Sequence, residues 1–389
     1  MKEAVIVSAV RTPVGKCRGQ LASVPAHQLG ALAVKTAVSR AGIAPEDIDD
    51  VIFANLMNHE INNMGRMVAL EAGLPVSVPG ITLDRQCAAS LNALAYGAMQ
   101  IMSGFADIIV AGGVESDSRR TWMLEKTETA YAVQPPRFVD IHTAPDHIGN
   151  PSMGLTAENV AAQYGFSRQE LDAFALRSHR RASLAWQAGR FDEQVVPVCL
   201  KDKKGREMLI AHDEPLREDC SLETLAGLAP CFRADGIVTA GNSSPMSDGG
   251  GALVLMEREL AERTGRDILG VFRGYAVAGV DPNVMGLGPI PATEKLLRQV
   301  GMGVGDIDLW ELNEAFSAQS LACIKAIGMD PDRVNPNGGA IALGHPLAGT
   351  GAILATKAVY DMRDRHLNNA VITFCVGGGQ GVAVLLTRE

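Results

Sequence analysis

Apolar and polar positions along the first part of the chain alternate in two distinct periods. Short apolar runs have the length and β-branched content of strands, and they cover residues 4–9, 51–54 and 107–111. Between them, residues 27–41 and 63–72 repeat their apolar positions at helical spacing, and the first of these runs stops at Gly42. Strands that alternate with helices predict a mainly parallel sheet that is covered on both faces.

Residues 76–83 form a further apolar run, which predicts a strand that is buried at least in its second half. Residues 91–101 then carry small and apolar side chains at helical spacing, so Cys87 should lie where a strand ends and a helix begins. The partial positive charge and free N–H groups of a helix N-terminus favour a thiolate, which is the nucleophilic form of cysteine. A buried cysteine that only packs is the alternative, and this stretch alone leaves both readings open.

Charge density rises between residues 116 and 250, and residues 143–145 have the composition of an irregular loop. Within this stretch, Ser167 and Glu170 form a capping box, so a helix should follow to about Gly189. These features predict an inserted subdomain that is rich in loops.

The strand-like character returns after residue 250, and the pattern of the first part is then repeated. The segment from Gly42 to Asp49 is echoed 259 residues later, from Gly301. The strand at 107–110 is matched by 370–373, which lie 263 residues further on, and at that spacing the helix after Cys87 overlays residues 350–362. Two similar α/β halves are the simplest interpretation. A site at their junction would draw residues from both halves.

Length, charge and cysteine usage exclude several classes of protein. The 389 residues are too many for one simple core, so two or three subdomains are expected. The net charge of −9 argues against nucleic acid as the main partner, because phosphate binding needs a basic face. Seven widely spaced cysteines without a CxxC pair indicate neither a disulfide framework nor a zinc site, and they fit a reducing cytosol. We also expect no signal peptide and no membrane span.

The second half offers three candidate clusters for chemistry. They are Asn313-Glu314-Ala315-Phe316 at the end of a strand at 309–312, the small-residue loop 338–346 around His345, and the run 375–381 that starts at Cys375. The glycines after Cys375 could present N–H groups to an anion or could simply form a tight turn. A lone histidine is more often structural, and Cys375 taken alone is most simply a core cysteine. No P-loop and no GxGxxG opening a helix is present.

Together, Cys87 at a helix start, Asn313-Glu314-Ala315-Phe316, Gly344-His345-Pro346 and the glycines after Cys375 strongly resemble the thiolase family of acyl-CoA acetyltransferases. The resemblance runs the whole length of the chain and accounts for the repeat. It implies a duplicated α/β fold with αβαβα layers and an inserted loop domain. The implied division is 1–115 with 251–270 for the N-terminal half, 116–250 for the inserted domain, and 271–389 for the C-terminal half.

The resemblance also implies catalytic roles. Cys87 would take the acyl group as a thioester, His345 would accept its proton, and Cys375 would be the second acid/base at the α-carbon of acetyl-CoA. One oxyanion hole would consist of His345 and a water held by Asn313, and the other of the N–H groups of Cys87 and Gly377. The kinetics would be ping-pong. No metal or other cofactor is expected, because coenzyme A thioesters are the substrates.

Further residues match the coenzyme A and acyl pocket positions of the family. These are Met153, Phe232, Ala240, Ser244, Met285, Ala315 and Phe316. For the methionines and Phe232, ordinary core packing is the alternative. Ser152 stands where many short-chain, biosynthetic members have a histidine, which leans the chain toward degradative 3-ketoacyl-CoA thiolases.

The expected activity is therefore thiolytic cleavage of a 3-ketoacyl-CoA, or the reverse Claisen condensation of acetyl-CoA. Alternatives are a short-chain biosynthetic acetoacetyl-CoA thiolase, a related Claisen enzyme such as a ketoacyl synthase, and a non-catalytic acyl-CoA or lipid carrier on the same scaffold. The expected partners are acyl-CoA, coenzyme A and further copies of the chain in a homodimer or homotetramer, in the cytoplasm, with no nucleic acid and no membrane.

Overall fold

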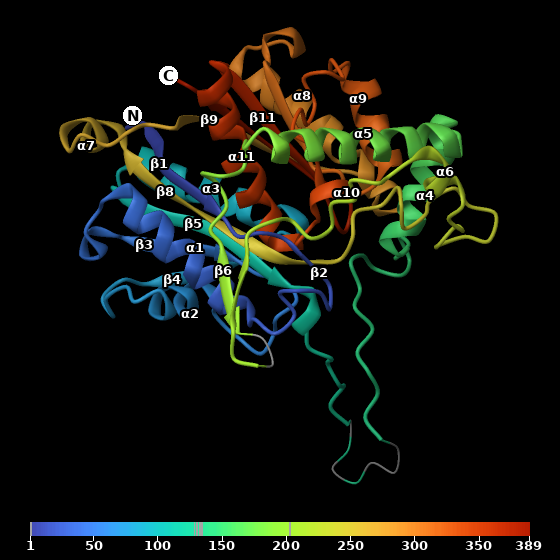
Figure 1. The fold of residues 1–389 in the computed structure, drawn as a ribbon, viewed down its shortest axis with the longest axis horizontal. Helices are drawn as coiled ribbons and strands as arrows, with labels where there is room; N and C mark the ends of the chain where they lie inside the picture. The colour runs from blue at the N-terminus through green and yellow to red at the C-terminus, as the bar shows by residue number, and fades with distance from the viewer. Residues whose placement is uncertain (1, 128, 130, 132–134, 202–203) are drawn as a thin grey trace.

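The computed structural model describes residues 2–127, 129, 131, 135–201 and 204–389. Its centre is a ten-stranded sheet in the order β10-β11-β12-β9-β1-β8-β5-β3-β4, with the short β2 paired to β8 (Figure 1). The strands of this sheet are β1 (Ala4–Arg11), β2 (Gly15–Lys16), β3 (Asp50–Ala54), β4 (Gly80–Leu83), β5 (Ile108–Ser116), β8 (Ser247–Glu257), β9 (Gly270–Gly279), β10 (Leu309–Leu312), β11 (Asn369–Val376) and β12 (Gln380–Thr387).

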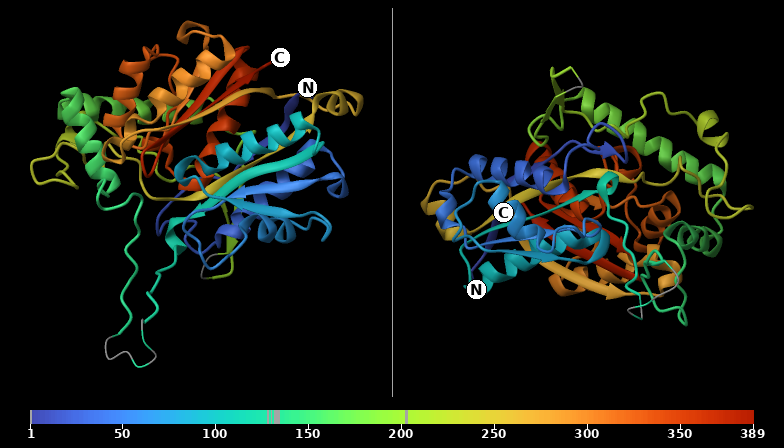
Figure 2. Two further views of the ribbon diagram at one scale, coloured as in Figure 1. Left: turned by 180° about the vertical axis from the view of Figure 1, so that it is seen from behind. Right: turned by 90° about the horizontal axis from the view of Figure 1, so that it is seen from below.

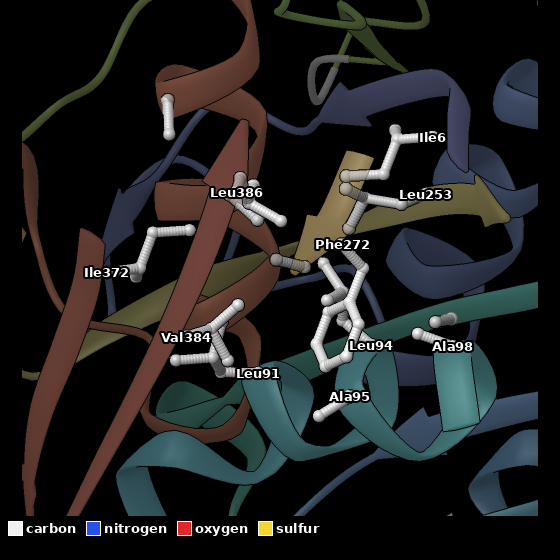
Figure 3. Close-up of a cluster of buried hydrophobic side chains, with 14 of the residues drawn as sticks. Ile6, Leu91, Leu94, Ala95, Ala98, Leu253, Phe272, Ile372, Val384 and Leu386 are labelled. Carbon is white, nitrogen blue, oxygen red and sulfur yellow. The ribbon is translucent and has the colours of Figure 1, made fainter. Parts of the chain in front are cut away.

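The sheet consists of two halves that meet where β1 pairs with β9. β1 and β9 pair at only two positions, so the strands on either side of this junction separate and leave room between them. Helices α3 (Ala89–Ser103) and α11 (Thr350–Arg365) fill that room and share one apolar core with both halves. Figure 3 shows Leu91 and Leu94 of α3 in the same cluster as Leu253 of β8 and Val384 of β12.

The composition of these two helices explains why they lie inside. Every residue of α3 from Ala89 to Ala95 is buried, and so is every residue of α11 from Thr350 to Met362. Helix α3 is mostly apolar, and the charged side chains of α11 have partners inside the protein: Lys357 pairs with Glu311 at 2.8 Å and Asp361 accepts from Asn337 at 2.7 Å. Both helices can therefore be covered on all sides. Alanine and glycine on both helices let the flanking strands approach closely, which matches the low aromatic content of the chain, 5%.

Further helices cover the outer faces of the two halves. α1 (Ala26–Ala41) and α2 (Met64–Glu71) pack on the half that contains β3, β5 and β8. On the other half, α8 (Pro289–Val300) and α9 (Ser317–Ile327) pack against β9 to β12. The result is the expected α/β fold with αβαβα layers. The remaining short helices of the two halves are α7 (Arg258–Arg263) and α10 (Ala340–Leu343).

The prediction of a mainly parallel sheet is wrong. Only β3–β4, β3–β5 and β10–β11 pair in parallel, and the other pairs of the large sheet are antiparallel. The prediction assumed that a crossover helix joins each strand to the next. Instead, β11 and β12 form a hairpin, and Gly378 and Gly379 in its turn have φ values of 81° and 80° that favour glycine.

The predicted strand at 76–83 is also shorter and less buried than expected. Strand β4 covers only Gly80–Leu83 and lies at the edge of the sheet. Ile81 is 46% exposed and Val76 is 80% exposed. An apolar run at a sheet edge cannot be distinguished from a buried strand by its composition alone.

Equivalent elements of the two halves lie about 260 residues apart in the sequence. The predicted spacing of 263 residues for the strand and the helix is wrong. The 3-10 turn Gln86–Ala88 precedes α3 as the turn Leu347–Gly349 precedes α11, which is a spacing of 261. Asp49 accepts the N–H groups of residues 107 and 108, and Asp308 accepts those of 368 and 369 in the same way. An alignment that is wrong by two residues still matches inward-facing with inward-facing side chains of a strand, so the apolar pattern could not reveal the error.

Between β5 and β8 lies the inserted segment, with helices α4 (Met153–Tyr164), α5 (Arg168–Gln187) and α6 (Leu222–Ala226) and the hairpin β6 (Val198–Lys201) to β7 (Glu207–Ile210). The capping box of Ser167 and Glu170 is confirmed. Residues near 120–127 and 135–141 form two legs that project from the body (Figures 1 and 2). The exact domain boundaries stay a prediction. Across the described part of the chain, no helix is both long and apolar enough to cross a membrane.

Candidate active site

Cys87 lies in a tight turn between β4 and α3, at the strand-to-helix position that the sequence predicted. The preceding residue, Gln86, has a φ of 47°, and its N–H donates to the carboxylate of Asp84 at 2.7 Å. A left-handed residue next to a reactive side chain is a form of local strain that the surrounding structure must hold in place. The turn presents the half-buried Cys87 toward the second half of the chain, where the N–H of Gly377 hydrogen-bonds its sulfur.

The expectation that the helix terminus favours a thiolate at Cys87 is wrong for the free site. Burial raises the pKa of Cys87 to about 11, and the nearby carboxylates of Glu115 and Asp84 add to this. The N–H groups of Gly377 and of Cys87 itself lower this pKa, but they do not outweigh burial. At neutral pH the resting nucleophile is therefore a thiol, which needs a proton acceptor before it can react.

His345 and Asn313 meet in the same site from two separate segments. Asn313 directly follows β10, and His345 follows α10. Asn313 Nδ2 lies 3.5 Å from His345 Nε2, and both side chains are buried. Burial lowers the pKa of His345 to about 4, so its ring is neutral at pH 7 and can take a proton. Asn313 Oδ1 is buried without a hydrogen-bond partner among the described residues, which leaves it free to bind a substrate group or a water.

Cys375 lies near the end of β11, two residues before Gly377. Its side chain is 1% exposed. Burial raises the pKa of Cys375 well above its ordinary value, and the nearby Cys87 raises it further. Cys375 is therefore protonated at neutral pH and is suited to donate a proton. The run of glycines that follows forms the β11–β12 turn, and the Gly377 N–H lies at the Cys87 sulfur. Binding of an anion by these N–H groups stays a prediction.

Most of the predicted pocket residues gather in one apolar cluster beside Cys375. Met285, Ala315 and Phe316 are buried in this cluster, and Met153 packs against it. The ring of Phe232 is 39% exposed and meets Phe316 edge-on at 6.2 Å between centroids.

The polar pocket positions flank this cluster. The N–H and the hydroxyl of Ser244 both donate to the carbonyl of Ala315 at 3.0 Å. Ala240 is exposed. These contacts bring six of the seven pocket residues to one region, and only Ala240 has no contact in it among those described.

Three polar residues support the site, of which the sequence named only Glu314, as part of a candidate cluster and without a role. Glu314 is buried and accepts hydrogen bonds from Ser178 Oγ at 2.6 Å and from Asn335 Nδ2 at 2.8 Å. Ser247 Oγ accepts the N–H of His345 at 3.1 Å, and Thr350 Oγ1 lies 2.7 Å from His345 Nδ1. Glu314 adjoins Asn313 in the sequence, which was the one available signal. Ser247 and Thr350 reach His345 only through the fold.

Comparison with known proteins identifies the family. Residues 4–259 match the family model described as "Thiolase, N-terminal domain", and residues 266–388 match "Thiolase, C-terminal domain". The chain belongs to the thiolase family. It is therefore an acyltransferase that acts on acyl-CoA and coenzyme A.

Curated relatives of this thiolase carry different substrate names. The chain is 44% identical to the 3-ketoacyl-CoA thiolase of Bacillus subtilis, with 98% of each chain covered. It is 43% identical to the 3-oxoadipyl-CoA/3-oxo-5,6-dehydrosuberyl-CoA thiolase of Escherichia coli, with 100% of each covered. The crystal structure of the Bacillus anthracis acetyl-CoA acetyltransferase has a TM-score of 0.95 at 40% identity and covers 100% of this chain and 99% of that chain.

The raised pKa of Cys87 predicts how its alkylation depends on pH. The rate of iodoacetamide labelling of Cys87 should keep rising from pH 7 to pH 10, because only the thiolate reacts and the folded-state pKa is about 11. Peptide mass spectrometry after timed quenching measures this rate. Exposed Cys231 is the internal control for the presence of active reagent. A Cys87 rate that is already constant above pH 8 would contradict the prediction.

Proposed function

We propose that this thiolase cleaves 3-ketoacyl-CoA substrates by a ping-pong reaction through an acyl-Cys87 intermediate. The observation that carries the proposal is a pair of adjoining groups at the starts of α3 and α11, whose Ala89 and Ala348 pack in one cluster. One group is Cys87 with the Gly377 N–H and Cys375, and the other is Asn313 with His345 at 3.5 Å. Cys87 comes from the first half of the chain and the other four from the second half. The reverse Claisen condensation uses the same groups.

The first step of the proposed reaction transfers the Cys87 proton to His345. The thiolate then attacks the 3-keto carbon, and the negative charge on its oxygen is held by the N–H groups of Cys87 and Gly377. In the free site both of these N–H groups hydrogen-bond the Cys87 sulfur, so they already point to where this charge would develop. Cleavage of the C2–C3 bond leaves the acyl group on Cys87 and releases the enolate of acetyl-CoA.

Cys375 completes the cleavage by protonating the enolate at C2. Its burial keeps it in the thiol form, which is the form that can donate. His345 and a water on Asn313 hold the enolate oxygen until the proton arrives. Free coenzyme A then gives its own thiol proton to the Cys375 thiolate and attacks the acyl-Cys87 thioester. The Cys87 thiolate leaves and takes back the proton that His345 received in the first step. This scheme uses no metal or redox cofactor, because the thioester carbonyl itself acidifies the α-carbon.

The coenzyme A arm is proposed to run along the apolar cluster beside Cys375. Met153, Phe232, Ala315 and Phe316 offer apolar contacts for the pantetheine chain, and Met285 is placed at its acyl end. Ala240 and Ser244 lie on the segment that leads to this cluster, and Ser244 is anchored by its hydrogen bonds to Ala315.

We propose a degradative role on 3-ketoacyl-CoA chains. Ser152 in place of the histidine of short-chain members supports this role, as do the substrate names of the two relatives at 43% and 44% identity. The short-chain biosynthetic alternative is supported by relatives named acetyl-CoA acetyltransferase at 40% identity. A non-catalytic acyl-CoA carrier is less favoured, because it has no need for Cys87, His345 and Cys375 together.

Thiolysis across substrates of increasing length tests this function. Loss of the 3-ketoacyl-CoA absorbance should be seen with acetoacetyl-CoA, and kcat/KM should rise by up to about fourfold for each added methylene that the pocket buries. The degradative proposal fails if activity is confined to acetoacetyl-CoA. Absence of turnover with every substrate would overturn the proposed enzyme itself.

Replacing Cys375 tests the division of labour between the two cysteines. In Cys375→Ala, exchange of the acetyl-CoA α-protons with deuterated water should fall about a hundredfold or more, because the acid/base at C2 is gone. The burst of free coenzyme A that accompanies acetylation of Cys87 should change much less.

The matched control for that variant is Cys323→Ala, because Cys323 is equally buried but lies outside the proposed reaction. It should leave both half-reactions close to those of the natural sequence. Equal losses of proton exchange and acetylation in Cys375→Ala would contradict the assignment of Cys375.

We also propose that the chain works as a homodimer or homotetramer in the cytoplasm. Strand β4 lies at an edge of the sheet, where a second copy of the chain could pair with it, and it leaves Ile81 partly exposed. The projecting legs carry Trp122, which is 75% exposed, and Phe138, which is 64% exposed. Light scattering on the purified chain should give two or four times its mass of 41.1 kDa. A monomer at micromolar concentration would contradict the proposal.

A further inference from the structure

We infer that Thr350 is a positioning residue for His345, and that its hydroxyl orients the imidazole so that Nε2 faces the substrate in both steps of the proposed reaction. The inference rests on the proposed function and extends it to a residue outside the set of groups that touch substrate. The observation is the 2.7 Å separation of Thr350 Oγ1 from His345 Nδ1, in a part of the site where both side chains are buried.

Few other contacts of His345 can fix the orientation of its ring. Its backbone N–H is held by Ser247 Oγ, but this contact does not orient the side chain. Asn313 lies 3.5 Å from Nε2, on the side that faces the substrate. Only Thr350 contacts the opposite ring nitrogen among the hydrogen bonds of the described residues. Thr350 is the first residue of the buried helix α11, so its position is set by the core rather than by a loop.

In the proposed reaction, Nε2 of His345 must be without a proton in the first step and must carry a proton in the second. To accept the Cys87 proton, Nε2 must be bare, and the proton of the neutral ring then lies on Nδ1. To donate to the enolate oxygen, Nε2 must carry a proton. One proton serves both steps, because the ring that has taken the Cys87 proton carries it on Nε2. Nδ1 keeps its own proton in both steps and remains a donor.

A hydroxyl group is a partner that suits both forms of the ring. Thr350 Oγ1 can accept from Nδ1–H in the neutral ring and in the protonated ring. A carboxylate would also accept, but its charge would stabilise the imidazolium at rest. No charged group contributes to the lowered pKa of His345, which has burial as its one cause. The environment therefore favours a ring that is neutral at rest and charged only while it holds the Cys87 proton.

The spacing of the repeat adds a second, independent feature. With 261 residues between equivalent positions, Thr350 corresponds to Ala89 at the start of α3. The same spacing pairs Cys87 with Ala348. Each half thus places one chemically active side chain at the start of its buried helix, at positions that differ by two residues. The nucleophile comes from α3 and the ring support from α11.

The isosteric variant Thr350→Val tests the inference. It removes the hydroxyl but keeps the shape, so kcat for thiolysis should fall about ten- to a hundredfold, the cost of leaving a buried polar group unpartnered. KM for coenzyme A should stay within about twofold, because Thr350 does not touch the pocket residues. Thr350→Ser should restore most of kcat, because it restores the hydroxyl.

The matched control is Thr356→Val on the same helix. Thr356 is fully buried and donates to the carbonyl of Ala352 at 2.8 Å, but it does not contact His345. If the effect of Thr350→Val were only structural, Thr356→Val would lose kcat to a similar extent. That result, or a Thr350→Ser variant as slow as Thr350→Val, would overturn the inference.

Alkylation separates this inference from the proposed function. Thr350→Val should slow the labelling of Cys87 by iodoacetamide at pH 8 several-fold relative to both the natural sequence and Thr356→Val, because the proton acceptor is misaligned. Equal labelling rates would overturn the role of Thr350 even in an active enzyme. A natural chain that labels as predicted but turns over no 3-ketoacyl-CoA would overturn the proposed function instead.

Discussion

The burial of α3 and α11 between two sheet halves is the constraint on which the rest of this structure depends. Both helices are buried around their circumference along these stretches, and the polar side chains of α11 are paired inside the protein, as Lys357 is with Glu311. Their common burial brings the starts of the two helices to the same end of the molecule. Cys87 precedes one helix and His345 precedes the other, so the packing of the core sets the distance between nucleophile and base. Asn313 and Cys375 reach the same place from the ends of β10 and β11, which pair in parallel and therefore end at one edge.

The same burial determines the charge state of the site. It raises the pKa of Cys87 to about 11 and lowers that of His345 to about 4, so the resting pair is a neutral thiol and a neutral imidazole. A preformed thiolate–imidazolium pair would need a lowered pKa at Cys87 and a raised pKa at His345. In the proposed reaction the thiolate forms only when substrate brings an electrophilic carbonyl, and the two N–H groups at the sulfur then stabilise the negative charge on the substrate oxygen. This arrangement protects a buried cysteine from reacting in the absence of substrate.

The sequence predicted the elements of this site well because its signals were local. An apolar run followed by a helical pattern placed Cys87 correctly, and the strand before Asn313 has the predicted bounds. The roles of Asn313, His345 and Cys375 came from resemblance to a family and not from periodicity. Strand direction could not be predicted in this way, because β8 joins β1 and β5 after a long insertion and β12 returns directly from β11. The pKa of Cys87 was also beyond local reasoning, because the groups that bury it come from the other half. Thr350 gave no signal, since one threonine in an apolar helix is unremarkable until its contact is known.

The most direct test of the account is the identity of the acylated residue. The chain is mixed with a 3-ketoacyl-CoA in the absence of free coenzyme A, quenched in acid, digested and analysed by mass spectrometry. The account predicts one acyl group on the peptide that contains Cys87, its loss when coenzyme A is added before the quench, and no acyl group in Cys87→Ser. Acylation of Cys375 or of another residue, or steady turnover by Cys87→Ser, would contradict the account.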